Sequence, residues 1–310
     1  MRVKRLKKRP KHFQNFTGLS IKEFDELVQG IRAQLEKEKE KPSRRRQRAV
    51  GGGRKPSLEL EDQVLVLLMY YRLYVTQLLL GYLVELDDSN VSRSINRLRP
   101  IMLKILPLPA RERGLFEEKE QTGGRIAKLE ELLECHPEIK EILIDATEQE
   151  IQKPKDKKKR KDNYSGKQKR HTLKTQIAAS KNGLVFHKTD ALPGKISDIN
   201  VLRATGVIRD MPDGIEVIVD KGYDGIQKDY PETDFYQPYK ARRNKPLDFI
   251  QKCLNQIQTK HRIAVEHVLG QLKKFKILAG IYRGSEATYD DTFSIITGIH
   301  NYKKLGKLSW

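Results

Sequence analysis

Residues 142–145 read Ile-Leu-Ile-Asp, and residues 217–220 read Val-Ile-Val-Asp. Each is a short apolar run of the kind that forms a buried strand, and each ends in an aspartate. Two carboxylates fixed at the ends of adjacent buried strands would repel each other unless a cation lay between them. Mg²⁺ suits such a place, because it prefers oxygen ligands and usually shares them with phosphate. The two runs therefore predict a metal-binding edge of a sheet.

A third acid, Glu266, lies in a long helix predicted over residues 248–276. Arg262 precedes it by four residues and Lys273 follows it by seven, so all three share one helix face. An acid between two cations could bind metal while the cations hold phosphates. The alternative is an ordinary ion pair between Arg262 and Glu266 on a solvated face.

The elements around the two aspartate runs predict the fold class of residues 139–306. Three strands, a helix, two more strands and further helices make a mixed α/β layer that is compatible with an RNase H-like fold. Between the second and third strands, Lys181-Asn182-Gly183 favours a type I′ hairpin turn. The strands are expected at 141–147, 172–179, 184–191, 216–220 and 234–239, and the other helices at 196–204 and 290–304.

Residues 58–106 predict an all-α helix-turn-helix domain. Its third helix starts near Ser89 and ends at Pro100, with Val91, Ile95 and Leu98 as its inner stripe. A helix bearing Ser, Asn and Arg outward fits the major groove of DNA. An ordinary three-helix cluster with a solvated face would give the same pattern. The residues off the stripe are Asn90, Ser92, Arg93, Asn96, Arg97 and Arg99.

Those outward residues divide by their place along the helix. Ser92, Arg93 and Asn96 lie near its start and are expected to reach bases, Arg suiting guanine and Asn suiting adenine. Arg97 and Arg99 lie nearer its end and are expected to contact phosphates.

The charge of the 310-residue chain is concentrated in two segments. Its net charge is +20, and residues 1–60 carry a balance of +11 while residues 151–174 carry +9. Two concentrated basic segments indicate a polyanion bound at two places. A membrane surface is a weaker explanation, because neither segment forms an amphipathic helix with a broad apolar face.

The first 57 residues are expected to hold a basic arm, a short helix and a linker. Residues 1–15 predict a flexible arm, and Ser20 with Glu23 fits a capping box that opens a helix over 16–40. Residues 41–57 combine glycines, prolines and basic residues, so they form either a solvated tether or a tether lying along a DNA groove. Residues 107–138 predict a helical connector.

Several classes of protein are excluded by the same sequence. It has two cysteines and no C-x-x-C, so a zinc site of the usual spacing is absent. It has no apolar run of membrane-spanning length and no secretory signal behind its basic start. These features favour a cytoplasmic protein with reduced thiols.

The sequence resembles the DDE transposases of bacterial insertion sequences, in the IS-five-like superfamily related to Harbinger elements. The likeness covers roughly residues 50–280, in order and in spacing. It is carried by GGGRKPSLELEDQVLVLLMYYR with SNVSRSINR, by ILIDATEQEIQKPK, by NYSGKQKRHTLKTQ, by PGKISDINVLR, by VIVDKGYDG and by HRIAVEHVLGQLKKFKIL.

The resemblance implies a catalytic and metal-binding triad of Asp145, Asp220 and Glu266, shared by two Mg²⁺ ions, with Mn²⁺ as an alternative. It implies strand cleavage at the ends of an insertion element, strand transfer into target DNA, and self-association on that double-stranded DNA. Arg262 and Lys273 match the family's cations around the Glu and are expected to bind the DNA backbone. The basic stretch 153–170 is expected to do so too, through Lys167, Lys169 and Arg170, while Tyr164 either stacks on an unpaired base or packs in its loop.

Two departures from the family pattern bear on activity. Ser197 replaces a frequent His before Asp198, and Thr259 replaces a frequent Tyr. Neither removes a metal ligand. A transposase-derived DNA-binding regulator without catalysis and a nuclease of the same fold remain alternatives, although three intact acids favour an enzyme.

Overall fold

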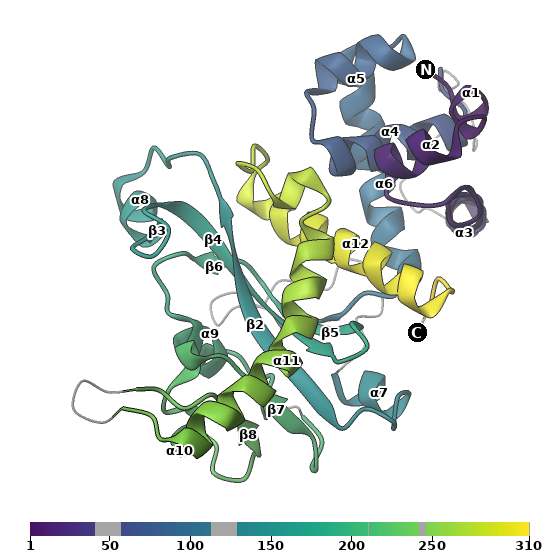
Figure 1. Ribbon diagram of the computed structural model, residues 1–310. Helices are drawn as coiled ribbons and strands as arrows, with labels where there is room; N and C mark the ends of the chain where they lie inside the picture. Colours follow the sequence, from purple (N-terminus) through teal and green to yellow (C-terminus); the bar gives the residue numbers. More distant parts are fainter. Residues whose placement is uncertain (41–56, 113–128, 210, 242–245, 310) are drawn as a thin grey trace.

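The computed structural model describes residues 1–40, 57–112, 129–209, 211–241 and 246–309. An N-terminal unit of helices is followed by a mixed sheet with helices on both faces (Figure 1). The predicted fold class, an all-α unit followed by a mixed α/β domain, is confirmed.

The first residues pack as helices, so the prediction of a flexible arm over 1–15 is wrong. They form α1 (Val3–Lys7) and α2 (Pro10–Thr17), in which Val3, Leu6 and Phe13 are buried. These apolar residues recur at helical spacing between the cations, and burying them outweighs the charge of the segment. Asp62 fixes the start of α1, because its Oδ1 accepts a hydrogen bond from the backbone N of Val3 at 2.8 Å.

The next helix begins where the capping box predicted. The backbone N of Ser20 donates to Glu23 Oε2 at 2.6 Å, and the backbone N of Glu23 donates to Ser20 Oγ at 3.3 Å. These bonds open α3 (Ile21–Glu40). The predicted linker lies, up to residue 56, outside the described residues.

Three helices follow, as expected: α4 (Leu60–Leu73), α5 (Gln77–Val84) and α6 (Asp88–Ile105). The prediction that the third ends at Pro100 is wrong, because α6 continues through that proline. Pro100 and Asn96 are both exposed. The carbonyl that loses its donor at Pro100 therefore lies on the solvent side of the helix, where water can satisfy it.

The described strands form an eight-stranded sheet in the order β1-β5-β4-β2-β7-β8, with β3 and β6 also paired to β4. β2 runs antiparallel to β4 and parallel to β7. The strands are β1 (Ala110–Glu112), β2 (Glu141–Glu150), β3 (Tyr164–Ser165), β4 (Arg170–Ser180), β5 (Val185–Thr189), β6 (Leu192–Pro193), β7 (Glu216–Ile218) and β8 (Phe235–Tyr236).

The described helices of this domain follow or connect its strands. The long helix is capped by Asp248 and Gln251 through a capping box. The predicted connector holds strand β1 as well as a helix, a difference from the expectation. The helices are α7 (Leu129–Glu134), α8 (Lys157–Asp162), α9 (Asp198–Ala204), η1 (Lys221–Tyr223), α10 (Ile226–Asp229), α11 (Phe249–Leu272), η2 (Lys276–Leu278) and α12 (Glu286–Leu305).

The β4–β5 hairpin has a different turn from the predicted type I′. Among the turn residues only Gly183 has a positive φ, at 85°. The backbone N of Gly183 donates to Ser180 O, and the backbone N of Ser180 donates to Leu184 O, both at 2.8 Å. The turn is therefore type I followed by a glycine bulge.

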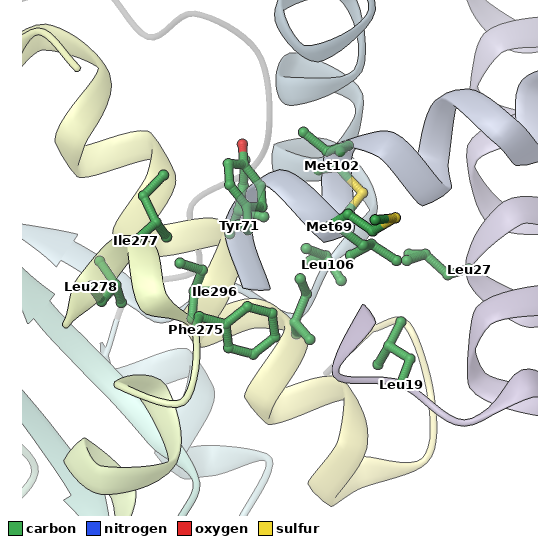
Figure 2. Close-up of a cluster of buried hydrophobic side chains, with 14 of the residues drawn as sticks. Leu19, Leu27, Met69, Tyr71, Met102, Leu106, Phe275, Ile277, Leu278 and Ile296 are labelled. Atoms are coloured by element: carbon green, nitrogen blue, oxygen red, sulfur yellow. The ribbon is translucent and has the colours of Figure 1, made fainter. Parts of the chain in front are cut away.

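One hydrophobic cluster joins the helical unit to one face of the sheet. Figure 2 shows Leu19, Leu27 and Met102 of the N-terminal unit in the same cluster as Phe275, Leu278 and Ile296. A second cluster fills the opposite face under α7 and α9, around Ile142, Ile144 and Phe186.

None of the described helices is long and apolar enough to cross a membrane.

Because Phe13 is fully buried, Phe13→Ala should lower the free energy of unfolding by about 3–5 kcal/mol. Urea denaturation followed by circular dichroism measures this. Lys8→Ala, at an exposed position of the same segment, is the control and should change stability by less than about 0.5 kcal/mol. A loss below about 1 kcal/mol for Phe13→Ala would instead support the prediction that residues 1–15 form a flexible arm.

Candidate active site

The first predicted aspartate lies on β2, and the second follows the end of the neighbouring strand β7. β2 and β7 run parallel, with Leu143 opposite Ile218. Asp145 follows Leu143 by two residues, and Asp220 follows Ile218 by two residues. Adjacent strands lie about 4.8 Å apart, so this register brings the two backbones side by side.

Both aspartates belong to the face that α11 covers. Side chains alternate along a strand, so Asp145 shares the face of Leu143, and Asp220 that of Ile218. Leu143 and Ile218 belong to the same cluster as Val265, Val268 and Leu272 of α11. Asp220 also caps η1 by accepting a hydrogen bond from the backbone N of Lys221. The chain therefore turns away directly after this carboxylate.

Negative charge is concentrated beside a buried phenol. Burial raises the pKa of Tyr223 well above its usual value, and the charges of Asp145, Asp198 and Asp220 raise it further. Gln176 opposes this rise, since its Nε2 donates to Tyr223 Oη at 2.8 Å. An uncharged tyrosine thus borders a group of carboxylates that would favour a bound cation.

Lys273 lies beside the same group. Burial of its ammonium group lowers the pKa of Lys273, and the charges of Asp145 and Glu148 oppose that lowering. Lys273, which follows Glu266 by two helical turns, is therefore close enough to Asp145 for their charges to interact.

Glu266 is exposed on α11, next to the buried Val265. The helix is continuous over Phe249–Leu272, and seven residues at about 100° each bring Lys273 back to within about 20° of Glu266. Glu266 therefore shares a helix face with Lys273, whose charge interacts with that of Asp145. The side chains of Arg262 and Thr259 lie outside the described residues.

The donor set suits Mg²⁺ in its chemistry, because every candidate ligand is a carboxylate oxygen. No three Asp, Glu, His or Cys of the described residues gather into a ready-made site for a single ion. Mg²⁺ does not require one, since it is commonly held by one or two carboxylates together with water and substrate phosphates. The metal-binding pair of Asp145 and Asp220 stays a prediction, as does the triad that they form with Glu266.

A buried ion cluster next to the site escaped the sequence analysis. Lys174 is 5% exposed, and its Nζ lies 2.7 Å from Asp198 Oδ1 and 3.5 Å from Glu148 Oε1. Glu148 faces Lys174 directly across the β2–β4 pair. A lysine inside a predicted buried strand was the available signal, because a buried cation requires acidic partners.

This cluster also supports the turn that carries Asp220. Gly222 packs against Asp198, and a Cβ at position 222 would lie 3.3 Å from Asp198 Oδ2. Ser197 precedes α9 and makes no capping bond with its side chain. Asp198, which the chain shares with the family pattern, thus has a packing role here. Ser197, which replaces the family's frequent His, is exposed.

On α6, the predicted inner stripe is confirmed, because Val91, Ile95 and Leu98 are buried. Arg93 and Asn96 are exposed, whereas Ser92 and Asn90 are half-buried. Arg93 Nη1 donates to Asn90 Oδ1 at 2.8 Å, which orients the guanidinium along the exposed face.

The two arginines expected to contact phosphate differ. Arg97 is exposed, and its Nη1 donates to Gln63 Oε1 at 3.4 Å. Arg99 is half-buried, with its Nε enclosed. Burial raises the pKa of Tyr71 to about 12, and the Arg99 guanidinium opposes that rise. This inward position argues against the predicted phosphate contact of Arg99.

The basic stretch forms α8 and the β3–β4 hairpin. Lys167, Lys169 and Arg170 are exposed, although Arg170 also pairs with Glu150 at 2.5 Å. Tyr164 is 43% exposed and meets His171 edge-on, with the ring centroids 5.6 Å apart. The tyrosine is thus partly packed in its hairpin and partly open.

Known proteins give the same picture of the chain. A family described as "DDE superfamily endonuclease" matches residues 144–301, and one described as "Helix-turn-helix of DDE superfamily endonuclease" matches residues 56–108. The chain is 32% identical over 297 residues to "Probable transposase for insertion sequence element IS702" from Microchaete diplosiphon, covering 94% of each chain. No solved structure matches the chain.

Removing the buried lysine should be costly, since Asp198 and Glu148 would lose their cation. Lys174→Met should lower the free energy of unfolding by about 3–5 kcal/mol. Lys181→Met, which removes a solvent-exposed pair with Glu141, is the control and should cost less than about 1 kcal/mol. Equal losses in the two variants by chemical denaturation would show that Lys174 is not a structural cation.

Proposed function

Because the chain belongs to the family of DDE superfamily endonucleases, we propose that it is a transposase that binds the ends of an insertion element and there cuts and joins DNA. The observation that carries this proposal is the parallel register of β2 and β7, in which Asp145 and Asp220 each follow the paired Leu143 and Ile218 by two residues, on the face covered by the helix that bears Glu266.

The three carboxylates would hold two divalent ions, Mg²⁺ or Mn²⁺. When bound, such ions activate water and stabilise the leaving oxygen of a phosphodiester. Lys273, beside Asp145, would bind a backbone phosphate next to the scissile bond, and Arg262 would bind another. Lys167 and Lys169 on the exposed hairpin would hold the strand beyond the cut.

The reaction takes place in two steps at one site. Water attacks the phosphodiester at the element's end, and the strand leaves with a free 3′-hydroxyl. That hydroxyl then attacks a phosphodiester of the target DNA, so that one bond forms for each bond broken. Two protein copies holding the two element ends would bring both ends to the target.

Base recognition belongs to the exposed face of α6. Arg93 and Asn96 lie near its start, where a recognition helix enters the major groove. Arg97 lies one helical turn beyond Arg93 and would contact phosphate. The described helix-turn-helix thus reads the element end, and the sheet domain performs the chemistry.

Asp145→Asn, Asp220→Asn and Glu266→Gln should each abolish cleavage of an element-end duplex in Mg²⁺, because each removes a ligand charge. Gel shifts with the same duplex should remain within about threefold of the parent protein. Asp213→Asn, at an exposed position before β7, is the control and should cleave normally. Retained cleavage in any of the three variants would remove that residue from the triad.

Strand transfer separates a transposase from a nuclease of the same fold. A pre-cut element end with a 3′-hydroxyl should be joined to supercoiled plasmid, whereas a 3′-dideoxy end should not. Cleavage without joining would identify a nuclease. Binding without either reaction would identify a regulator.

Arg93→Ala should relax sequence preference at one base pair, with a loss of about 1–3 kcal/mol of discrimination. Arg97→Ala should weaken binding to all sequences alike and leave the preference profile unchanged. Binding to a set of single-base variants of the element end measures both. An unchanged profile for Arg93→Ala combined with Asn96→Ala would show that α6 does not read the sequence.

A further inference from the structure

A basic hollow of about 440 Å³ lies between the N-terminal helices and the C-terminal elements. We call it the junction hollow. Its walls come from the end of α2, the end of α4, the end of α11 and the last turns of α12. Arg72, Lys274, Lys303 and Lys304 line it, and none of its described lining residues is acidic.

Two of these cations are held in place by carbonyl oxygens. Lys303 Nζ donates to Gly18 O at 2.9 Å. Arg72 Nε donates to Asn15 O at 3.3 Å, and its guanidinium lies 5.2 Å from the centre of the Phe275 ring. Neutral groups thus orient both side chains, and none of the described residues that line the hollow supplies a carboxylate.

Helix ends give a simpler explanation for part of this charge. The C-terminus of a helix carries roughly half a negative charge, so four converging ends would offset about two of the four cations. A net positive charge of about two remains after this offset. Burial lowers the pKa of His300, as do Lys304 and Lys303, although its hydrogen bond to Gly183 O opposes this. The imidazole therefore adds no charge at neutral pH.

The wall also carries neutral donors of the kind that contact DNA backbone. Gln14, Asn15 and Gln271, whose side chains end in amides, also line the hollow. Amide and cationic side chains are both among the groups that contact phosphate oxygens in protein–DNA complexes. The combination suits consecutive phosphates better than it suits a single small anion.

We propose that the junction hollow binds the phosphate backbone of the DNA between the segment read by α6 and the segment cut at Asp145. Arg72 lies on α4, the first helix of the helix-turn-helix domain, and Lys274 directly follows Lys273, whose charge interacts with that of Asp145. The hollow therefore connects the elements proposed to hold the two ends of this segment. This inference rests on the proposed function, and DNA is favoured over a free polyphosphate by that continuity.

The test is the salt dependence of DNA binding by the full chain. Lys274→Gln/Lys303→Gln/Lys304→Gln should reduce the slope of log affinity against log salt by about 2–3, since each lost phosphate contact removes about 0.9. The probe is a labelled 40-base-pair element-end duplex measured by fluorescence anisotropy. The matching triple Lys→Arg variant should keep the parent slope.

A control variant separates the hollow from net charge. Lys37→Gln/Lys39→Gln/Lys228→Gln removes three exposed cations outside the hollow and should leave the slope unchanged. Equal slopes for both glutamine variants would overturn the proposal. A hollow that serves only to neutralise helix ends would instead lower the melting temperature of the first variant without altering its slope.

Binding of tripolyphosphate tests whether the hollow holds a free polyphosphate instead of DNA. If calorimetry finds tight binding of tripolyphosphate that the glutamine variant loses while its DNA slope stays unchanged, the hollow binds a free polyphosphate and the proposal fails. Cleavage by the parent protein is scored separately. If the parent protein does not cleave but the glutamine variant shows the expected change in slope, the proposed function fails and the proposal for the hollow stands. If the parent protein cleaves but the slope does not change, the proposed function stands and the proposal for the hollow fails.

Discussion

The parallel pairing of β2 with β7 is the constraint on which the site depends. Three consecutive residue pairs, ending with Leu143 opposite Ile218, fix the register of the two strands. A slip of one residue would turn Asp220 to the opposite face, away from α11 and Asp145. Strand β2 is also held on its other side by nine residue pairs with β4, so the position of Asp145 is determined from both sides.

The sheet and the DNA-binding helices share one hydrophobic core, which fixes their relative orientation. Gly298 of α12 permits this close packing, because a Cβ there would lie 2.8 Å from a side-chain carbon of Leu108. At the other end of the junction, Arg283 stacks on the Tyr74 ring 4.2 Å from its centre, and Tyr282 donates its backbone N to Glu150 O at 2.8 Å. Tyr74, at the end of α4, is thus linked to Glu150, at the end of β2, through the consecutive residues Tyr282 and Arg283. A rigid junction would hold the recognised sequence at a set distance from the cut.

The sequence was sufficient where periodicity and local chemistry agree. The aspartates after apolar runs, the capping box of α3 and the inner stripe of α6 could all be predicted, because each depends on residues close together in the chain. Pro100 was misjudged, since a proline can remain within a helix when the freed carbonyl faces water. Residues 1–15 were misjudged because three apolar side chains among many cations give a weak pattern until their partner α4 is known. Lys174 and its acids could not be assembled, because Asp198 comes from a different element and only the strand register shows that Glu148 faces the lysine.

The central claim is that Asp145, Asp220 and Glu266 together hold divalent ions at the end of β7. The most direct measurement is a crystal structure with Mn²⁺ and a pre-cut element end, in which anomalous scattering locates the ions. Mn²⁺ should lie between Asp145 and Asp220 within direct ligand distance of both carboxylates, with Glu266 completing the site and the terminal 3′-hydroxyl beside it. Manganese bound elsewhere, or Asp145 and Asp220 on separate ions with Glu266 turned to solvent, would contradict the account.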